Sequence, residues 1–200
     1  MLAAVLAPPA IFALLLALVG AIALRELVAL RRAGVPAALE GALLVIGLAA
    51  LFWLRTWWDG DLARPGVVPP PLVAILATWA ADVGAYLIGS VAGSHKLAPT
   101  LSPGKTREGT IGGFVAGGLT VVALGAIGEG LPNGAALALT IGPAALAGDL
   151  LESWVKRRAG VKDSGTLLPG HGGMLDRIDS LIATAPLVAA FLAGPLLRAP

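Results

Sequence analysis

The sequence predicts an all-α integral membrane protein, a polytopic bundle of about six transmembrane helices. Of its 200 residues 57% are hydrophobic and only 13% are charged, and the mean hydropathy is +0.87. An ordinary soluble chain carries about a quarter charged residues, so the composition excludes a soluble domain, and with it a disordered chain, a coiled coil and a collagen-like repeat. The chain has no cysteine, which excludes disulfides, thiolate metal sites and cysteine nucleophiles. A net charge of +2 gives no basis for nucleic acid binding.

The first apolar run, residues 1–24, has no charged side chain and exceeds the roughly 20 residues that cross a hydrocarbon core. No basic residue precedes it, so it lacks the form of a secretory signal and is expected to stay as a helix. Five further apolar runs follow, at 41–58, 70–92, 110–129, 134–150 and 180–197. Residues 1–200 are therefore expected to form a single membrane domain, with N-terminal spans in 1–69 and the later spans and loops in 70–200.

The fourth and fifth runs are separated only by a short turn at 129–134, which predicts a helical hairpin. The fourth run contains a stripe of small residues: Gly112, Gly113, Gly117 and Gly118. Small residues let helices approach closely in lipid, and such a stripe is also compatible with a homodimer.

Positive charge is unevenly distributed between the loops. Six spans put loops 25–40, 93–109 and 151–179 on one side of the membrane and loops 59–69 and 130–133 on the other. The first side holds 11 of the 14 basic residues, namely Arg25, Arg31, Arg32, Lys96, Lys105, Arg107, Lys156, Arg157, Arg158, Lys162 and Arg177. The positive-inside rule makes these loops cytoplasmic. We therefore expect a multi-pass protein of the inner (cytoplasmic) membrane, with these loops facing the cytoplasm.

Carboxylates concentrate at two expected helix ends on that side. One helical face collects polar residues at i, i+3, i+4, i+7 and i+8: Asp149, Glu152, Ser153, Lys156 and Arg157. Asp176 and Asp179, three apart, open the sixth span. Mg²⁺ is usually held by one or two carboxylates together with substrate phosphates, so this pattern favours a site for a polyanion and a divalent cation.

Asp82 lies near the middle of an otherwise uncharged span. An ionisable residue there faces the bundle interior or a water-filled cavity, where it could hold a second cation or pair with a buried basic residue.

Simpler interpretations exist for other motifs. Lys156, Arg157 and Arg158 could be a stop-transfer cluster on anionic lipid, and the glycines around His171 a plain turn. Residues 102–105 are not a Walker loop, because the second glycine spacing and the strand context are missing.

The string from residue 153 to 179 resembles the signature of the phosphatidate cytidylyltransferases, also called CDP-diacylglycerol synthases. The matching residues are Ser153, Lys156, Arg157, Lys162, Asp163, Pro169, His171, Gly172, Gly173, Asp176, Arg177 and Asp179. Residues 102–106 with Glu108 and Gly109, and residues 82–86, also resemble the family, so the resemblance covers about 75–185. Arg107 stands where the family commonly has an aromatic residue, and some N-terminal spans of the family are expected to be missing.

The resemblance implies that CTP and phosphatidate react to CDP-diacylglycerol and pyrophosphate at the bilayer. It also implies that residues 70–200 hold the catalytic spans and cytoplasmic loops, with the active site facing the cytoplasm. It implies Asp149 and Asp176 as metal ligands for Mg²⁺ and as catalytic residues, together with Lys156, Arg157, His171 and Arg177. The substrate-binding residues that it implies are Ser102, Lys105, Thr106, Ser153, Lys162, Asp163, Gly172, Gly173 and Asp179.

Two other functions stay open from the sequence. The first is a CTP-dependent transferase acting on another lipid phosphate or on a polyprenol. It stays open because an apolar groove binds many kinds of acyl or isoprenoid tail through buried apolar area alone. The second is a small ion-coupled transporter that uses Asp82 and the cytoplasmic carboxylates as its path. It predicts ion flux without CTP consumption and leaves the polar string 162–179 unexplained.

Overall fold

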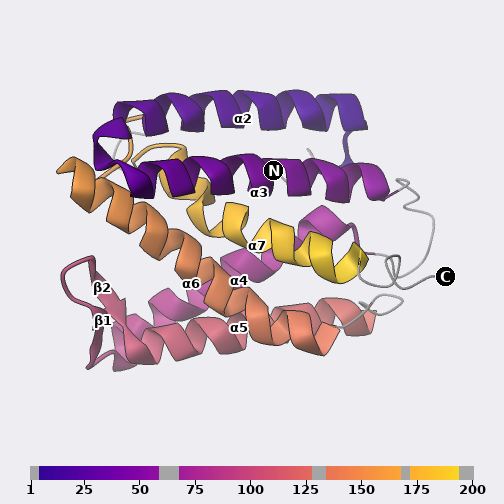
Figure 1. Cartoon of the computed structure of the whole chain (residues 1–200). Coiled ribbons are helices and arrows are strands. Elements are labelled where there is room, and N and C mark those ends of the chain that lie inside the picture. Colours follow the sequence, from indigo (N-terminus) through magenta and orange to yellow (C-terminus); the bar gives the residue numbers. More distant parts are fainter. Residues whose placement is uncertain (1–4, 59–67, 128–133, 168–171, 194–200) are drawn as a thin grey trace.

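The computed structural model describes residues 5–58, 68–127, 134–167 and 172–193, and is a bundle of long helices (Figure 1). In chain order the long helices are α2 (Pro9–Ala29), α3 (Val35–Trp57), α4 (Pro70–Ala92), α5 (Arg107–Ile127), α6 (Gly134–Ala159) and α7 (Leu175–Ala193). A short 3-10 turn, η1 (Arg31–Ala33), joins α2 to α3. The predicted all-α membrane bundle is confirmed.

Five of these helices, α2 to α6, are long and apolar enough to cross a membrane. The sixth expected span, α7, does not meet that measure within the described residues, because three charged side chains stand in its first two turns: Asp176, Arg177 and Asp179. The remainder of α7 is largely buried in the bundle.

Several helix boundaries differ from the predicted apolar runs: α2 ends at Ala29 and not at residue 24, α3 begins at Val35 and not at residue 41, and α7 begins at Leu175 and not at residue 180. Helix α2 begins at Pro9, because proline fits the first turn of a helix, where its missing N–H costs nothing; residues 1–4 of the predicted span lie outside the described residues. Helix α6 continues past residue 150 to Ala159, so the predicted helical face that carries Asp149, Glu152, Ser153, Lys156 and Arg157 is confirmed. The third span, by contrast, begins and ends where predicted.

The loop expected at 93–109 contains a β-hairpin that the sequence analysis did not predict. Strands β1 (Lys96–Ala98) and β2 (Ser102–Thr106) pair antiparallel, with Lys96 opposite Thr106 and Ala98 opposite Ser102. Period-two alternation of apolar residues, the usual sign of a strand, is absent from residues 102–106. At its end Thr106 caps α5, since its Oγ1 accepts a hydrogen bond from Gly109 N at 3.1 Å.

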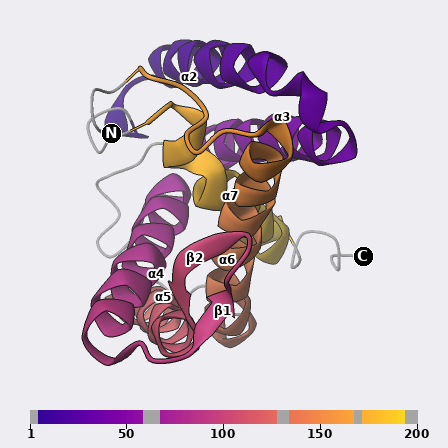
Figure 2. The same ribbon diagram turned by 90° about the vertical axis from the view of Figure 1, so that its left-hand side faces the viewer.

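Helices α2 and α3 lie along one side of the bundle and α5 along the other, with α4, α6 and α7 between them (Figure 1). One end of the bundle collects η1, the hairpin and the carboxyl-terminal end of α6, as seen end-on in Figure 2. The described parts of the three loops with the basic excess therefore meet at the same end.

The glycine stripe of α5 packs inside the chain. A Cβ added at Gly113 would lie 2.7 Å from the backbone oxygen of Ala81 in α4, and one at Gly118 would lie 2.8 Å from that of Ala138 in α6. The stripe thus allows close helix contact, as predicted, but its partners are the chain's own α4 and α6. A homodimer stays a prediction, with no support from this stripe.

Candidate active site

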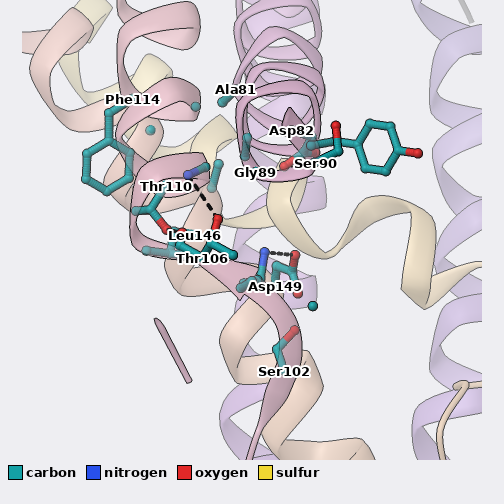
Figure 3. Close-up of a pocket in the computed structure, with 18 residues that line it drawn as sticks. Ala81, Asp82, Gly89, Ser90, Ser102, Thr106, Thr110, Phe114, Leu146 and Asp149 are labelled. Atoms are coloured by element: carbon teal, nitrogen blue, oxygen red, sulfur yellow. Dashed lines mark hydrogen bonds and ion pairs between the residues drawn. The ribbon is translucent and has the colours of Figure 1, made fainter. Parts of the chain in front are cut away.

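A cavity of about 370 Å³ opens among α4, α5, α6 and the hairpin. Figure 3 shows the side chains that line it. The polar ones come from several elements: Asp82 and Ser90 of α4, Ser102, Lys105 and Thr106 of β2, Thr110 of α5 and Asp149 of α6. The predicted substrate-binding residues of the hairpin therefore face the same space as a predicted metal ligand from a different part of the chain.

Asp149 is held between two partners at the cavity wall. Its Oδ2 forms an ion pair with Nζ of Lys105, and its Oδ1 accepts a hydrogen bond of 3.4 Å from Oγ of Ser153, one turn further along α6. The ion pair is drawn as the dashed line at Asp149 in Figure 3. The side chains of Lys105 and Asp149 are 22% and 28% exposed, so a small molecule in the cavity can reach both.

Asp82 lines the same cavity, as expected for an ionisable residue inside a span. Its Oδ1 accepts a hydrogen bond of 3.4 Å from Oγ of Ser180 in α7. One turn earlier in α4, Thr78 lies 2.6 Å from Thr184 between the hydroxyl oxygens. These contacts fix α4 against α7 beneath the cavity.

Asp176, the other predicted metal ligand, lies at the start of α7 in a dense set of hydrogen bonds. Its Oδ1 pairs with Nζ of Lys156 at 2.6 Å. Its Oδ2 accepts from Ser164 N at 2.9 Å, Ser164 Oγ at 2.8 Å and Gly173 N at 2.7 Å. Burial acts to raise the pKa of Asp176, but hydrogen bonds with Glu152, Lys156 and backbone N–H groups outweigh it and hold that pKa below its ordinary value. Asp176 is therefore a carboxylate at neutral pH.

Lys156 holds two carboxylates at once. Its Nζ lies 2.5 Å from Oε2 of Glu152, one turn back on α6, as well as 2.6 Å from Asp176. The Glu152 side chain is 1% exposed, and its Oε1 has no hydrogen-bond partner in the described structure. A buried carboxylate with an unused oxygen is one that a cation or a water molecule would satisfy.

Helices α6 and α7 touch closely between the two aspartates. A Cβ added at Gly148 would collide with the backbone oxygen of Asp179. Burial, together with the charge of Asp149, raises the pKa of Asp179 well above its ordinary value. Asp149 follows Gly148 and lines the cavity. Asp176, one turn before Asp179, is not among the residues that line the cavity, and it pairs with Lys156 and Ser164 instead.

The remaining predicted residues lie around this centre. Gly172 has φ of 81°, a left-handed conformation that favours glycine, and a Cβ there would lie 2.6 Å from Asp176 Oδ2. Arg157 is exposed and donates to the backbone oxygens of Leu101 and Val161 at 3.3 and 2.9 Å, so it ties α6 to the hairpin. Of the other predicted site residues, Lys162, Asp163 and Arg177 are exposed, and His171 lies outside the described residues.

The donor set suits Mg²⁺. No group of three or more acidic or histidine side chains forms a ready metal cluster in the described ranges. Mg²⁺ does not require one, because it commonly keeps several waters and takes one or two carboxylates plus substrate phosphates. Asp149 and Asp176 are such carboxylates, and each is paired with a lysine that a cation could replace.

Glu26 of α2, which the sequence analysis did not single out, belongs to this centre. Its carboxylate accepts from the N–H groups of Met174 and Leu175, both at 2.9 Å, and from Ser164 Oγ at 3.2 Å. One signal was available, since Glu26 is the sole acidic residue before Glu40 and interrupts a basic, apolar region. Its partners, more than 130 positions away, could not be read from the sequence.

The fold and this site define a helical membrane protein in which carboxylates, hydroxyls and the ammonium group of Lys105 line a cavity at one end of the bundle. The chain belongs to the cytidylyltransferase family, whose sequence pattern it matches over residues 66–194.

Relatives named phosphatidate cytidylyltransferase support this membership. The one from Synechocystis sp. is 50% identical over 145 residues, which are 70% of this chain and 48% of that protein. The one from Brucella suis is 52% identical over 118 residues, covering 56% of this chain and 43% of the relative. The one from Pseudomonas aeruginosa is 42% identical over 154 residues, covering 74% and 56%. The chain thus spans about half the length of the relatives it matches.

Proposed function

We propose that this chain transfers the cytidylyl group of CTP to phosphatidate, forming CDP-diacylglycerol and pyrophosphate. The observation that carries the proposal is the meeting of Ser102, Lys105 and Asp149 in one cavity. The names of the relatives and the membership of the family support the same reaction.

In this reaction a phosphate oxygen of the lipid attacks the α-phosphorus of CTP. The bond from that phosphorus to the bridging oxygen breaks, and pyrophosphate leaves with the bonding electrons. Two anions must approach each other, so catalysis depends mainly on positioning and on neutralising charge. Asp149 and Asp176 would hold Mg²⁺, which when bound supplies charge neutralisation between the phosphate groups.

The lysines can exchange partners as substrates bind. Lys105 neutralises Asp149, and Lys156 neutralises Asp176 and Glu152. When the carboxylates bind a cation, the two ammonium groups become available to phosphate oxygens without moving far.

We further propose that this end of the bundle faces the cytoplasm, where CTP is found, in the inner membrane of a bacterial cell. The excess of basic residues in the loops that meet at this end supports this orientation. The apolar faces of α4 and α5, which leave Tyr86, Val91 and Val115 exposed, suit contact with lipid tails.

The experiment that tests the function uses the purified chain in detergent with radiolabelled CTP and Mg²⁺. Phosphatidate is compared with an ether-linked lipid phosphate and with a polyprenyl phosphate. We expect labelled lipid product and an equal amount of pyrophosphate with phosphatidate. Labelled product with only one of the other two lipids would show that the chain uses a different lipid substrate. In a separate assay with the chain reconstituted in vesicles, ion flux without CTP consumption would favour the transporter.

A further inference from the structure

Glu26 joins the N-terminal helix α2 to the first turn of α7. Its Oε1 accepts from Met174 N and its Oε2 from Leu175 N, each at 2.9 Å. The first N–H groups of a helix have no partner inside the helix and need one from elsewhere. Glu26 supplies that partner from a helix remote in the sequence, and its negative charge also suits the positive end of the α7 dipole.

The loop backbone lies close against the Glu26 carboxylate at two glycines. A Cβ added at Gly165 would lie 2.6 Å from Oε1 of Glu26, and one at Gly173 would lie 2.5 Å from Oε2. Both glycines therefore let the loop backbone close around the carboxylate.

Glu26 and Asp176 both lie within hydrogen-bond distance of the same loop residue, Ser164. Oγ of Ser164 lies 3.2 Å from Oε2 of Glu26 and 2.8 Å from Oδ2 of Asp176. Gly173, which packs on Glu26, donates its N–H to Asp176 at 2.7 Å. The position of Asp176 thus depends on loop atoms that Glu26 holds in place.

We propose that Glu26 is a positioning residue for the reaction: it fixes the start of α7 and the loop around Ser164, and so orients the Asp176 carboxylate toward the cation. The inference rests on the proposed function in one respect: cytidylyl transfer is taken as the reaction in which the cation takes part. Glu26 lies outside residues 66–194, so the family pattern does not assign it this role. With this role for Glu26, the N-terminal helix α2 contributes to the active site in addition to crossing the membrane.

The test compares Glu26→Gln with wild type and with a matched control, Arg25→Gln. Glutamine keeps the length of the side chain but has one accepting oxygen, and its NH₂ group faces a backbone donor. Arg25 is the exposed neighbour on the same turn of α2. Hydrogen exchange is followed by mass spectrometry on peptides covering 172–180 and α5, and Mn²⁺ binding is measured by EPR without CTP.

We expect amide exchange at Met174 and Leu175 to rise about tenfold or more in Glu26→Gln, while exchange in α5 stays unchanged. We expect Mn²⁺ affinity to fall by roughly 10- to 100-fold, the usual effect of removing a group that orients a metal ligand. Arg25→Gln should match wild type in both.

Three results for Glu26→Gln would overturn the proposal. The first is unchanged amide exchange at Met174 and Leu175, and the second is faster exchange there with unchanged Mn²⁺ affinity. The third is equally faster exchange throughout α5, which indicates a general structural role. None of these readouts uses CTP or lipid. A wild type that makes no CDP-diacylglycerol would therefore reject the proposed function, while amide exchange and Mn²⁺ affinity would still decide whether Glu26 positions Asp176.

Discussion

Lys156 of α6 and Asp176 of α7 form an ion pair with 2.6 Å between Nζ and Oδ1. The pair is nearly enclosed, with side-chain exposures of 12% and 8%, and Glu152 joins it on the same ammonium group. One ammonium group thus contacts two acidic side chains at the junction of the two helices that carry the predicted metal ligands.

Replacing Lys156 with methionine should destabilise the protein. The change leaves Glu152 and Asp176 without a counter-charge, and removing one partner of a buried pair costs about 3–5 kcal/mol. Thermal denaturation in detergent should show a lower Tm for Lys156→Met, and a partial recovery when Glu152→Gln is added. Lys162→Met, at an exposed position, is the control; an equal loss in both variants would contradict the role of the buried pair.

Replacing Lys105 with methionine should weaken CTP binding. Lys105 lines the cavity and pairs with Asp149, and a hydrogen bond to a charged group contributes about 1.5–3 kcal/mol, or roughly 10- to 100-fold in affinity. The KM for CTP should rise by that factor. Lys96→Met, on the exposed first strand of the same hairpin, should keep the wild-type KM. A KM equal for all three proteins would remove Lys105 from the nucleotide site.

Thr106 should matter for the stability of α5. Its hydroxyl caps that helix through Gly109 N, and loss of such a cap costs about 1 kcal/mol. Thr106→Ala should lower the midpoint of chemical denaturation, whereas Thr106→Ser, which keeps the hydroxyl, should restore most of it. Equal midpoints for the alanine and serine variants would mean that the cap contributes nothing.

Gly148→Ala should separate α6 from α7. The added methyl group would collide with the backbone of Asp179, and overpacking of this kind costs roughly 1–3 kcal/mol. Both Tm and CDP-diacylglycerol formation should fall. Gly41→Ala is the control, because a Cβ there meets only the flexible end of Leu27 at 3.3 Å. Wild-type activity in Gly148→Ala would show that this helix contact does not set the site.

The sequence allowed the helical class, the third span and the polar face of α6 to be predicted, because apolar runs and 3.6-residue spacing are local signals. It also indicated Asp149, Lys105 and Asp176 as site residues. The hairpin was missed because residues 102–106 lack strand alternation.

The contacts between distant segments could not be predicted. Glu26 meets Leu175, and Asp82 meets Ser180, only after four or more helices have packed. Nothing in the local pattern around a single carboxylate tells which backbone N–H or hydroxyl will reach it. The different partners of Lys105 and Lys156 likewise follow from the fold and not from spacing.

Whether Asp149 and Asp176 act together is best decided by the Mg²⁺ dependence of CDP-diacylglycerol formation in Asp149→Asn and Asp176→Asn, each measured beside wild type and Lys96→Met. We predict that wild type and Lys96→Met need Mg²⁺ and form product from CTP and phosphatidate. Each asparagine variant should insert normally into membranes and lose about 100-fold or more of the rate at saturating Mg²⁺. Turnover near the wild-type rate in either asparagine variant would contradict the claim that these two carboxylates, one on α6 and one on α7, serve the reaction together.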